Sequence, residues 1–204
     1  MVNVLHETKF LSLFDIENDG KHYFMASRKN KDRLAVNNIG HDVADAVSCV
    51  IILEKDGEFY LLLNDEFRTP LGRTTIGVPA GLIDDGEDII SAAVREIYEE
   101  TGITVKPDDV RLIKERSYAS PGMTDESNAF VKVVLNYDDV INDITTDHTE
   151  GDEQISGHEI LSFNEVVNNM YSNPNLDFSM STFIAMSIFT TYTLSKKFER
   201  IGVE

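Results

Sequence analysis

Four glutamates and one arginine recur at fixed spacings between Gly81 and Ile103. The segment reads GLIDDGEDIISAAVREIYEETGI, and its key charged residues are Glu87, Arg95, Glu96, Glu99 and Glu100. Residues three and four positions apart are neighbours on a helix, so the last three glutamates would share one patch. Carboxylates gathered in this way repel each other unless a cation offsets their charge. Mg²⁺ prefers oxygen ligands and typically combines a few carboxylates with water and substrate phosphates.

A helix is expected to begin after Asp84-Asp85-Gly86 and to end at Gly102. Acidic residues suit the positive end of a helix dipole, and glycine suits the left-handed residue that follows a helix. Apolar residues at i, i+3, i+4 and i+7 predict one face packed against a core: Ile90, Ala93, Val94 and Ile97. Arg95 can pair with Glu87 and Glu99, but one guanidinium does not neutralise all the glutamates. A solvated acidic helix face is the alternative interpretation, and the spacing of the glycines and the arginine weighs against it.

The segment resembles, position for position, the signature of the Nudix superfamily, Gx5Ex7REUxEExGU, where U is a bulky aliphatic residue. This superfamily hydrolyses nucleoside diphosphates linked to another group. The resemblance implies an α+β fold, an α/β/α sandwich around a mixed sheet. It also implies a site for Mg²⁺, or alternatively Mn²⁺, with Glu96, Glu100, Glu99 and the backbone carbonyl of Ala80 as ligands. Glu87 and Arg95 would hold the glutamates in place.

Motifs outside this signature resemble the ADP-ribose pyrophosphatase branch. VPAG leads into the signature, FR lies upstream, and SPGMTDE lies downstream, followed by an acidic loop and DEQI. The resemblance implies substrate contacts from Arg68, Gly81, Gly122 and Met123. It implies that Glu126 contacts metal or orients water, and that a later glutamate is the general base. Glu153 is the best match for this base, and Glu150 is a near alternative.

The reaction implied is hydrolysis of the diphosphate bridge of ADP-ribose to AMP and ribose 5-phosphate. Mg²⁺ would clamp the bridge oxygens and activate a water, while a carboxylate removes the water proton. The glutamates of the signature are committed to metal and to Arg95, so the base must come from downstream. Two alternatives remain open: another nucleoside diphosphate sugar or NADH as substrate, and a non-catalytic nucleotide-binding Nudix sensor. Such sensors usually lose the signature glutamates, which are all present here.

Composition limits the remaining function classes. The chain has 204 residues, 42% of them hydrophobic, which fits one sizeable domain or a domain with a small extension. Its net charge of −18 argues against nucleic-acid or anionic-membrane partners. The single cysteine, Cys49, excludes an intrachain disulfide. No secretory signal and no apolar run of about 20 residues is visible, so a cytoplasmic protein is expected.

The elements that position these residues follow from apolar patterns. Residues 1–42 are expected to form an N-terminal β extension that contains a hairpin around Asn18-Asp19-Gly20, and residues 43–204 the Nudix hydrolase domain. The aromatic side chains of the extension either pack on the main domain or form a dimer surface, and the family resemblance implies a homodimer. Because the chain has no tryptophan, any adenine stacking would fall to Phe or Tyr.

Further strands, helices and one acidic loop are expected in the main domain. The strands are at 44–53, 59–63, 110–113 and 129–135, the acidic loop is at 136–154, and the helices are at 162–171 and 178–194. The earlier helix opens with a Ser162–Glu165 capping box. Two arginines ahead of the signature, Arg68 and Arg73, are both candidates to hold a phosphate.

Overall fold

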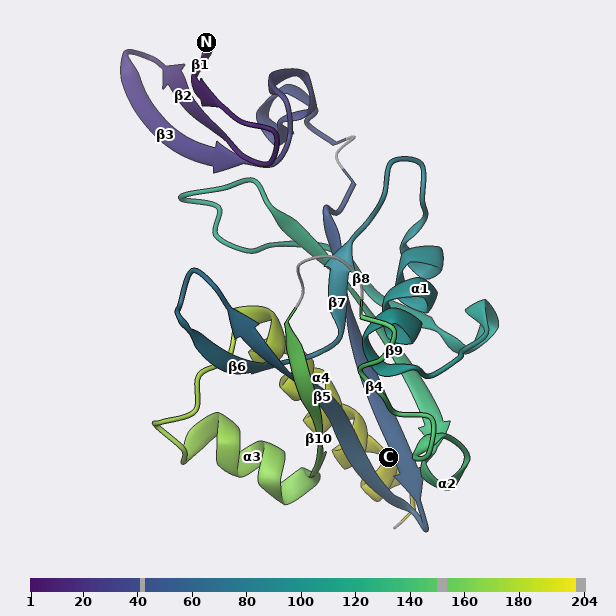
Figure 1. Cartoon of the computed structure of the whole chain (residues 1–204). Coiled ribbons are helices and arrows are strands. Elements are labelled where there is room, and N and C mark those ends of the chain that lie inside the picture. Colours follow the sequence, from purple (N-terminus) through teal and green to yellow (C-terminus); the bar gives the residue numbers. More distant parts are fainter. Residues whose placement is uncertain (41–42, 150–153, 201–204) are drawn as a thin grey trace.

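The computed structural model describes residues 1–40, 43–149 and 154–200. Its largest element is a seven-stranded mixed sheet of order β10-β5-β4-β9-β8, in which β6 also pairs with β5 and β7 with β4 (Figure 1). The strands are β4 Ala46–Lys55, β5 Glu58–Arg68, β6 Arg73–Gly77, β7 Ala80–Leu82, β8 Arg111–Tyr118, β9 Ser127–Asn136 and β10 Ile155–Ser162. The central strand β4 is parallel to β9 and antiparallel to β5.

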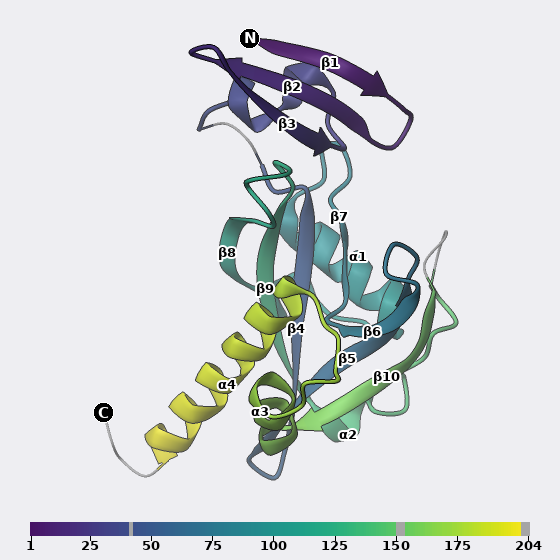
Figure 2. The ribbon, with the colours of Figure 1, turned by 90° about the vertical axis from the view of Figure 1, so that its left-hand side faces the viewer.

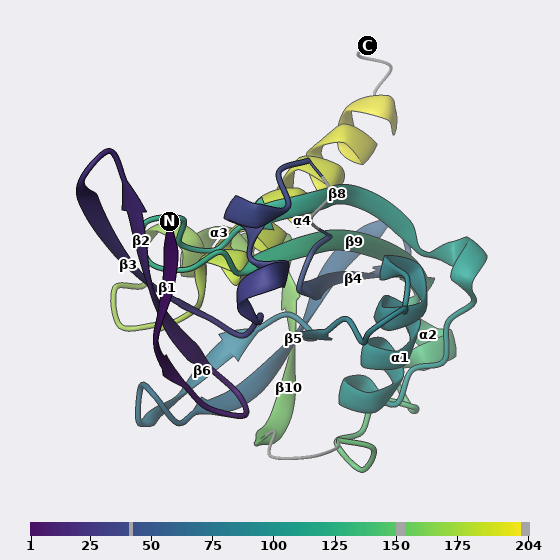
Figure 3. The ribbon, with the colours of Figure 1, turned by 90° about the horizontal axis from the view of Figure 1, so that it is seen from above.

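Helices cover both faces of this sheet. They are α1 Ile89–Thr101, α2 Tyr137–Val140, α3 Phe163–Tyr171 and α4 Met180–Arg200, with a 3-10 turn at Pro107–Asp109. Alternate residues of β4 belong to two different core clusters: Cys49 and Ile51 lie with α1, while Val50 and Ile52 lie with α3 and α4. The sheet therefore lies between α1 and the α3–α4 pair (Figure 3). The expected α+β fold, a mixed sheet flanked by helices, is confirmed.

The two central strands, β4 and β5, separate along their length. β4 pairs with β5 through residues 51–55 but with β7 through residues 46–48. β5 pairs with β4 through residues 58–62 but with β6 through residues 64–68. The chain passes from β6 to β7 where the strands separate, and the N–H of Cys49 donates to the carbonyl of Pro79 at 2.8 Å. The segment that leads into the glutamate helix is thereby held at the centre of the sheet.

A separate three-stranded antiparallel sheet forms the N-terminal region (Figures 1 and 2). Its strands are β1 Val2–Glu7, β2 Ser12–Asn18 and β3 Lys21–Ser27, followed by the 3-10 helices η1 Lys31–Arg33 and η2 Ala35–Asn37. The expected hairpin is confirmed, because Asn18 pairs with Lys21 around Asp19 and Gly20, both at positive φ. In the segment after β3, Leu34 is fully buried with Val2 and Phe14. The division into domains 1–42 and 43–204 stays a prediction.

The helix ends follow the local sequence signals. Asp88 caps α1 by accepting from the N–H groups of Ile90 and Ser91, and Gly102 ends it in the left-handed region at φ 76°. The predicted capping box of α3 is confirmed between Ser162 and Glu165. None of the helices in the described ranges combines the length and apolar character needed to cross a membrane.

Candidate active site

Arg95 organises the carboxylates of α1. Its Nη1 lies 2.6 Å from Oε1 of Glu96 and 3.0 Å from Oε2 of Glu99. Its Nε and Nη2 donate to the two carboxylate oxygens of Glu87 at 3.1 and 2.9 Å, and Nη2 also donates to the carbonyl of Leu82. These bonds, first of all those to Glu87, raise the pKa of Arg95, while Arg95 lowers the pKa of Glu87. One guanidinium thus fixes the helix carboxylates relative to the loop that precedes the helix.

Glu100 is held from the opposite side, by the separated strands. Its Oε2 accepts from Nδ2 of Asn64 on β5 at 2.5 Å and from the N–H of Ala80 on β7 at 3.1 Å. Glu100 is only 4% exposed, and Asn64 is also buried. The carboxylate at the end of α1 therefore faces the point where β4 and β5 separate.

Glu96 lies against the backbone of Gly81. Glu96 is 4% exposed, and a Cβ atom at Gly81 would overlap its carboxylate. Glycine is required here because the backbone approaches the carboxylate closely, and not because of a left-handed φ. Gly81, the first residue of the motif, and Glu96, one of its glutamates, are thus in direct contact.

A cleft of about 620 Å³ opens beside this contact, and we call it the active-site cleft. The lining residues with charged side chains include Arg28, Arg68 and Glu126, and the backbone of Ala80 and Gly81 also lines the cleft. The apolar lining residues include Leu71, Phe130, Phe178, Met180 and Ile184. The two arginines suit an anionic group, and the apolar side chains suit an apolar or aromatic group.

The two candidate phosphate-binding arginines have different surroundings. Arg68 lines the active-site cleft and lies 2.6 Å from Oε2 of Glu66. Burial raises the pKa of Glu66, and the positive charge of Arg68 opposes this rise. Arg73 instead pairs with Asp177 at 2.7 Å on the surface. Arg68 is therefore the better placed of the two for a ligand in the cleft.

The candidate site residues that follow the glutamate motif in sequence lie in three different places. Glu126 lines the active-site cleft, and its Oε2 lies 3.5 Å from Nε of Arg28. Gly122 lines a different cavity, beneath the N-terminal sheet, and Met123 is exposed with its carbonyl accepting from the N–H of Ala26. Glu150 and Glu153 lie outside the described residues. Their assignment as general base stays a prediction, as do the roles of Gly122 and Met123 in substrate binding.

The donor set beside Gly81 fits a hard divalent cation. Within the described ranges, no three His, Cys, Asp or Glu side chains are arranged to hold a metal by themselves. Nevertheless, two buried carboxylates, Glu96 and Glu100, converge on the Ala80–Gly81 backbone from the same helix. Oδ1 of Asn64, beside Glu100, is a buried oxygen atom without a hydrogen-bond partner. Carboxylate and amide oxygens with room for substrate are the ligands that Mg²⁺ prefers.

Two polar residues of the site were not anticipated. Asn64 follows the apolar run FYLLL in a central strand, and a polar residue at the end of such a run is a readable signal for a buried hydrogen bond. Arg28 lies far from the motif in sequence, on the segment after β3, so nothing local indicated its place in the cleft.

A family model and several known proteins match part of this chain. A family model described as "NUDIX domain" matches residues 43–183. A protein named putative nudix hydrolase 2, from Caenorhabditis elegans, is 38% identical over 95 residues, which cover 47% of this chain and 42% of that protein. A protein named ADP-ribose pyrophosphatase, from Bacillus subtilis, is 40% identical over 78 residues, which cover 38% of this chain and 40% of that protein. The matched region thus spans less than half of each relative.

A solved structure has the same fold over nearly the whole chain. It is titled "Crystal structure of ADP compounds hydrolase" and superposes with a TM-score of 0.60 at 16% identity, covering 99% of this chain and 94% of that one. At this identity the likeness concerns the fold alone.

Proposed function

The chain belongs to the Nudix family, and on that premise we propose that it is a Mg²⁺-dependent pyrophosphohydrolase that cleaves ADP-ribose to AMP and ribose 5-phosphate. Its likeness to a protein named ADP-ribose pyrophosphatase supports the choice of substrate. We further propose that it acts as a homodimer.

The observation that carries this proposal is the convergence of Glu96 and Glu100 on the Ala80–Gly81 backbone at the edge of the cleft. Both carboxylates are buried, and burying a carboxylate is costly unless a cation or hydrogen bonds compensate its charge. Gly81 belongs both to this carboxylate site and to the wall of the cleft. A diphosphate in the cleft would therefore lie next to the carboxylates.

The residues of the chain divide the work of hydrolysis. Glu96, Glu100 and Glu99, with the carbonyl of Ala80, would hold Mg²⁺ or Mn²⁺. When bound, such a cation supplies Lewis acidity toward the diphosphate oxygens. Arg95 and Glu87 keep the carboxylates in place, because their bonds tie the helix to the preceding loop. Arg68 and Arg28 donate to phosphate oxygens through their planar guanidinium groups.

A carboxylate downstream of the helix removes the proton from the attacking water. Glu153 is our first candidate for this base, and Glu150 is the alternative. Glu126 orients the water from the wall of the cleft. One water molecule adds across the bridge, so that each product carries one phosphate.

A hydrolysis assay tests the proposal, coupled to a phosphatase that releases phosphate from AMP and ribose 5-phosphate but not from ADP-ribose. Purified protein is incubated with Mg²⁺, Mn²⁺ or EDTA and with ADP-ribose, other nucleoside diphosphate sugars, NADH and dinucleoside polyphosphates. We expect metal-dependent hydrolysis of ADP-ribose to AMP, identified by chromatography. If none of these substrates is hydrolysed, the proposal that the protein is an enzyme is rejected, and a nucleotide-binding module is favoured instead. Turnover of GDP-mannose well above that of ADP-ribose would reject the assignment of ADP-ribose as the substrate.

A further inference from the structure

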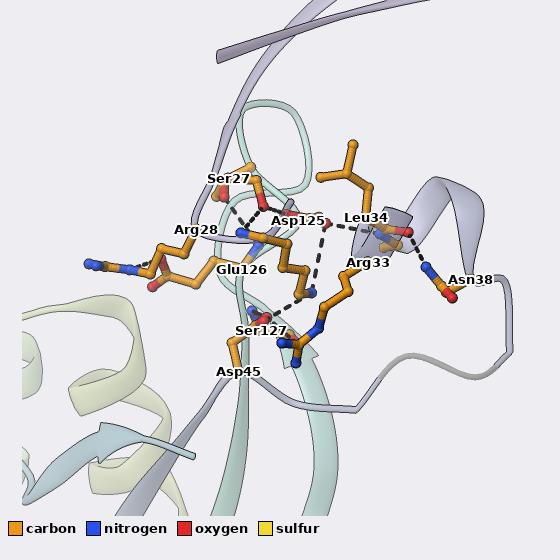
Figure 4. A network of polar contacts seen from close by, with 12 residues as sticks. Ser27, Arg28, Arg33, Leu34, Asn38, Asp45, Asp125, Glu126 and Ser127 are labelled. Atoms are coloured by element: carbon orange, nitrogen blue, oxygen red, sulfur yellow. Dashed lines mark hydrogen bonds and ion pairs between the residues drawn. The ribbon is translucent and has the colours of Figure 1, made fainter. Parts of the chain in front are cut away.

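A buried polar network joins the N-terminal sheet to the start of β9 (Figure 4). At its centre is Asp125, which is 9% exposed. Its Oδ1 accepts from Oγ of Ser27 at 2.6 Å, and its Oδ2 accepts from the N–H of Ala35 at 2.9 Å. Both donors belong to the N-terminal region, on opposite sides of η1. One carboxylate thus holds two separate points of that region against the segment that leads into β9.

Lys29 connects this carboxylate to a second one. Its Nζ lies 2.9 Å from Oδ1 of Asp45 and 3.7 Å from Oδ2 of Asp125, and its side chain is only 11% exposed. Oδ2 of Asp45 in turn accepts from the N–H and Oγ of Ser127 at 2.9 and 3.0 Å. Removing one member of such a buried charged set leaves another charge without compensation, which is strongly destabilising.

The network fixes the backbone on both sides of Glu126. Asp125 precedes it and Ser127 follows it, and each is held by the contacts described above. The carbonyl of Glu126 itself accepts from the N–H of Ala119 at 2.8 Å. The direction in which the Glu126 side chain leaves the backbone is therefore determined by the network.

The same contacts fix Arg28. This residue lies between Ser27 and Lys29, whose side chains are both committed to the network. The guanidinium of Arg28 lies beside the Glu126 carboxylate and lines the active-site cleft. Arg28 and Glu126 thus meet at the lining of the cleft, although Arg28 follows β3 of the N-terminal sheet and Glu126 precedes β9 of the main sheet.

We propose that Asp125, assisted by Ser27 and Lys29, is a positioning residue that docks the N-terminal region and thereby orients Glu126 and Arg28 in the active-site cleft. The catalytic part of this inference rests on the proposed function. The competing interpretation is that the network only anchors the N-terminal sheet, with no effect on the reaction.

Asp125→Asn is the first test, because it preserves size but replaces one acceptor oxygen by an N–H₂ donor. That donor would face either the N–H of Ala35 or the hydroxyl of Ser27. The buried ammonium group of Lys29 would also lose one of its two negatively charged partners. With ADP-ribose and Mg²⁺, we expect kcat of the folded variant to fall about tenfold or more, since small displacements at a reacting centre have effects of this size. Hydrogen exchange at the Ala35 and Ser127 amides should accelerate in the same variant.

Milder and matched variants keep the test decisive if Asp125→Asn folds poorly. Ser27→Ala removes the hydrogen bond to Asp125 and the one that Oγ of Ser27 accepts from the N–H of Lys29, without changing charge, and should lower kcat in the same direction. Lys29→Arg should retain more activity than Lys29→Met, because it keeps the positive charge. Asp85→Asn is the control: its exposed ion pair with Arg33 also spans from the N-terminal region to the main domain, at the loop between β7 and α1, and it should leave kcat and exchange unchanged.

Activity is measured at a temperature where circular dichroism shows each variant to be fully folded. A variant set that lowers the melting temperature but leaves kcat and KM of the folded protein unchanged would overturn the positioning role. If the wild-type protein hydrolyses none of the substrates, the proposed function is rejected, and this result does not by itself test the positioning role. Unchanged amide exchange at residues 126–127 in Asp125→Asn would then overturn the positioning role, and accelerated exchange there would support it.

Discussion

Gly81 leaves no room for one added carbon atom. A Cβ at this position would overlap the carboxylate of Glu96, which is buried and bonded to Arg95. We expect Gly81→Ala to destabilise the protein by about 1–3 kcal/mol, the usual cost of overpacking, and to weaken Mn²⁺ binding because Glu96 is displaced. Denaturant unfolding and calorimetry measure the two effects. Gly77→Ala is the matched control, since its Cβ would make only an ordinary contact with Thr182; equal behaviour of the two variants would contradict the prediction.

Glu100 is 4% exposed and accepts hydrogen bonds from residues of β5 and β7. Glu100→Gln keeps an oxygen that can accept from Asn64 and Ala80, so the fold should persist. The lost charge should lower metal-dependent hydrolysis by about 100-fold or more, since even residues that only support metal ligands cost about 10- to 100-fold. Steady-state kinetics at several Mg²⁺ concentrations measure this loss, with Glu115→Gln on the exposed face of β8 as control. An unchanged rate would mean that the metal is held elsewhere.

The general base is predicted from resemblance alone. Loss of a general base typically lowers the rate by about 10²- to 10⁴-fold, so we expect a loss of this size in Glu153→Gln and a much smaller one in Glu150→Gln. The pH dependence of kcat should also lose its acidic limb in the variant that lacks the base. If only Glu150→Gln is inactive, the base lies three residues earlier than proposed.

At the scale of elements, the N-terminus of α3 offers a measurable cap. Ser162 accepts from the N–H of Glu165, and the Glu165 carboxylate accepts from the hydroxyl and N–H of Ser162. Ser162→Ala should cost about 1 kcal/mol of unfolding free energy, as loss of an N-cap usually does. Thr190→Ala, on α4 and away from any helix end, serves as control. Equal unfolding free energies in Ser162→Ala and wild type would show that the cap contributes nothing.

The same cap should weaken in acid. Hydrogen bonds from the hydroxyl and then the N–H of Ser162 lower the pKa of Glu165. A lowered pKa in the folded state means that the contribution is present above the unfolded pKa of about 4.3 and is lost as pH falls through the folded value. The stability difference between wild type and Glu165→Ala should therefore shrink below about pH 4. A difference that grows in acid would contradict this assignment.

Local signals predicted some elements, and non-local contacts decided others. The ends of α1 and α3 were readable because Gly102, Ser162 and Glu165 act within one helical turn. The strands β1 and β10 were missed, since neither has a clear apolar alternation and each lies at the edge of its sheet. The short helix α2 lies inside the expected acidic loop and is capped by Asn136. Its low apolar content masked that signal.

The candidate site divides in the same way. The members of the cluster around Arg95 could be named from the motif, and helical spacing accounts for the pairing of Arg95 with Glu99. Arg28 and Asn64 reach the site through chain folding over long separations, and neither belongs to the motif. The motif therefore predicts the carboxylate helix, while the other walls of the cleft depend on how the strands and the N-terminal region are arranged.

At the scale of the whole molecule, the N-terminal sheet exposes large apolar side chains. Phe10, Tyr23 and Phe24 are 70%, 63% and 62% exposed, and large exposed apolar side chains are candidates for an interaction site. If these residues face a second copy, Tyr23→Ser combined with Phe24→Ser should convert a dimer to a monomer in light scattering. Leu194→Ser, on the exposed side of α4, is the control. A monomeric wild-type protein would reject the proposed homodimer.

The overall charge should also affect the capture of substrate. A net charge of −18 repels an anionic diphosphate, and added salt screens this repulsion as the Debye length falls from about 30 Å at 0.01 M to about 8 Å at 0.15 M. At constant free Mg²⁺, kcat/KM for ADP-ribose should therefore rise several-fold with NaCl over this range, while kcat changes little. Replacing the exposed Asp108 and Asp109 by Asn should raise kcat/KM at low salt and flatten its salt dependence, because the long-range repulsion is reduced. If kcat/KM instead falls with salt, the local positive charge of Arg28 and Arg68 outweighs the charge of the whole chain, and the cleft attracts its substrate from a distance.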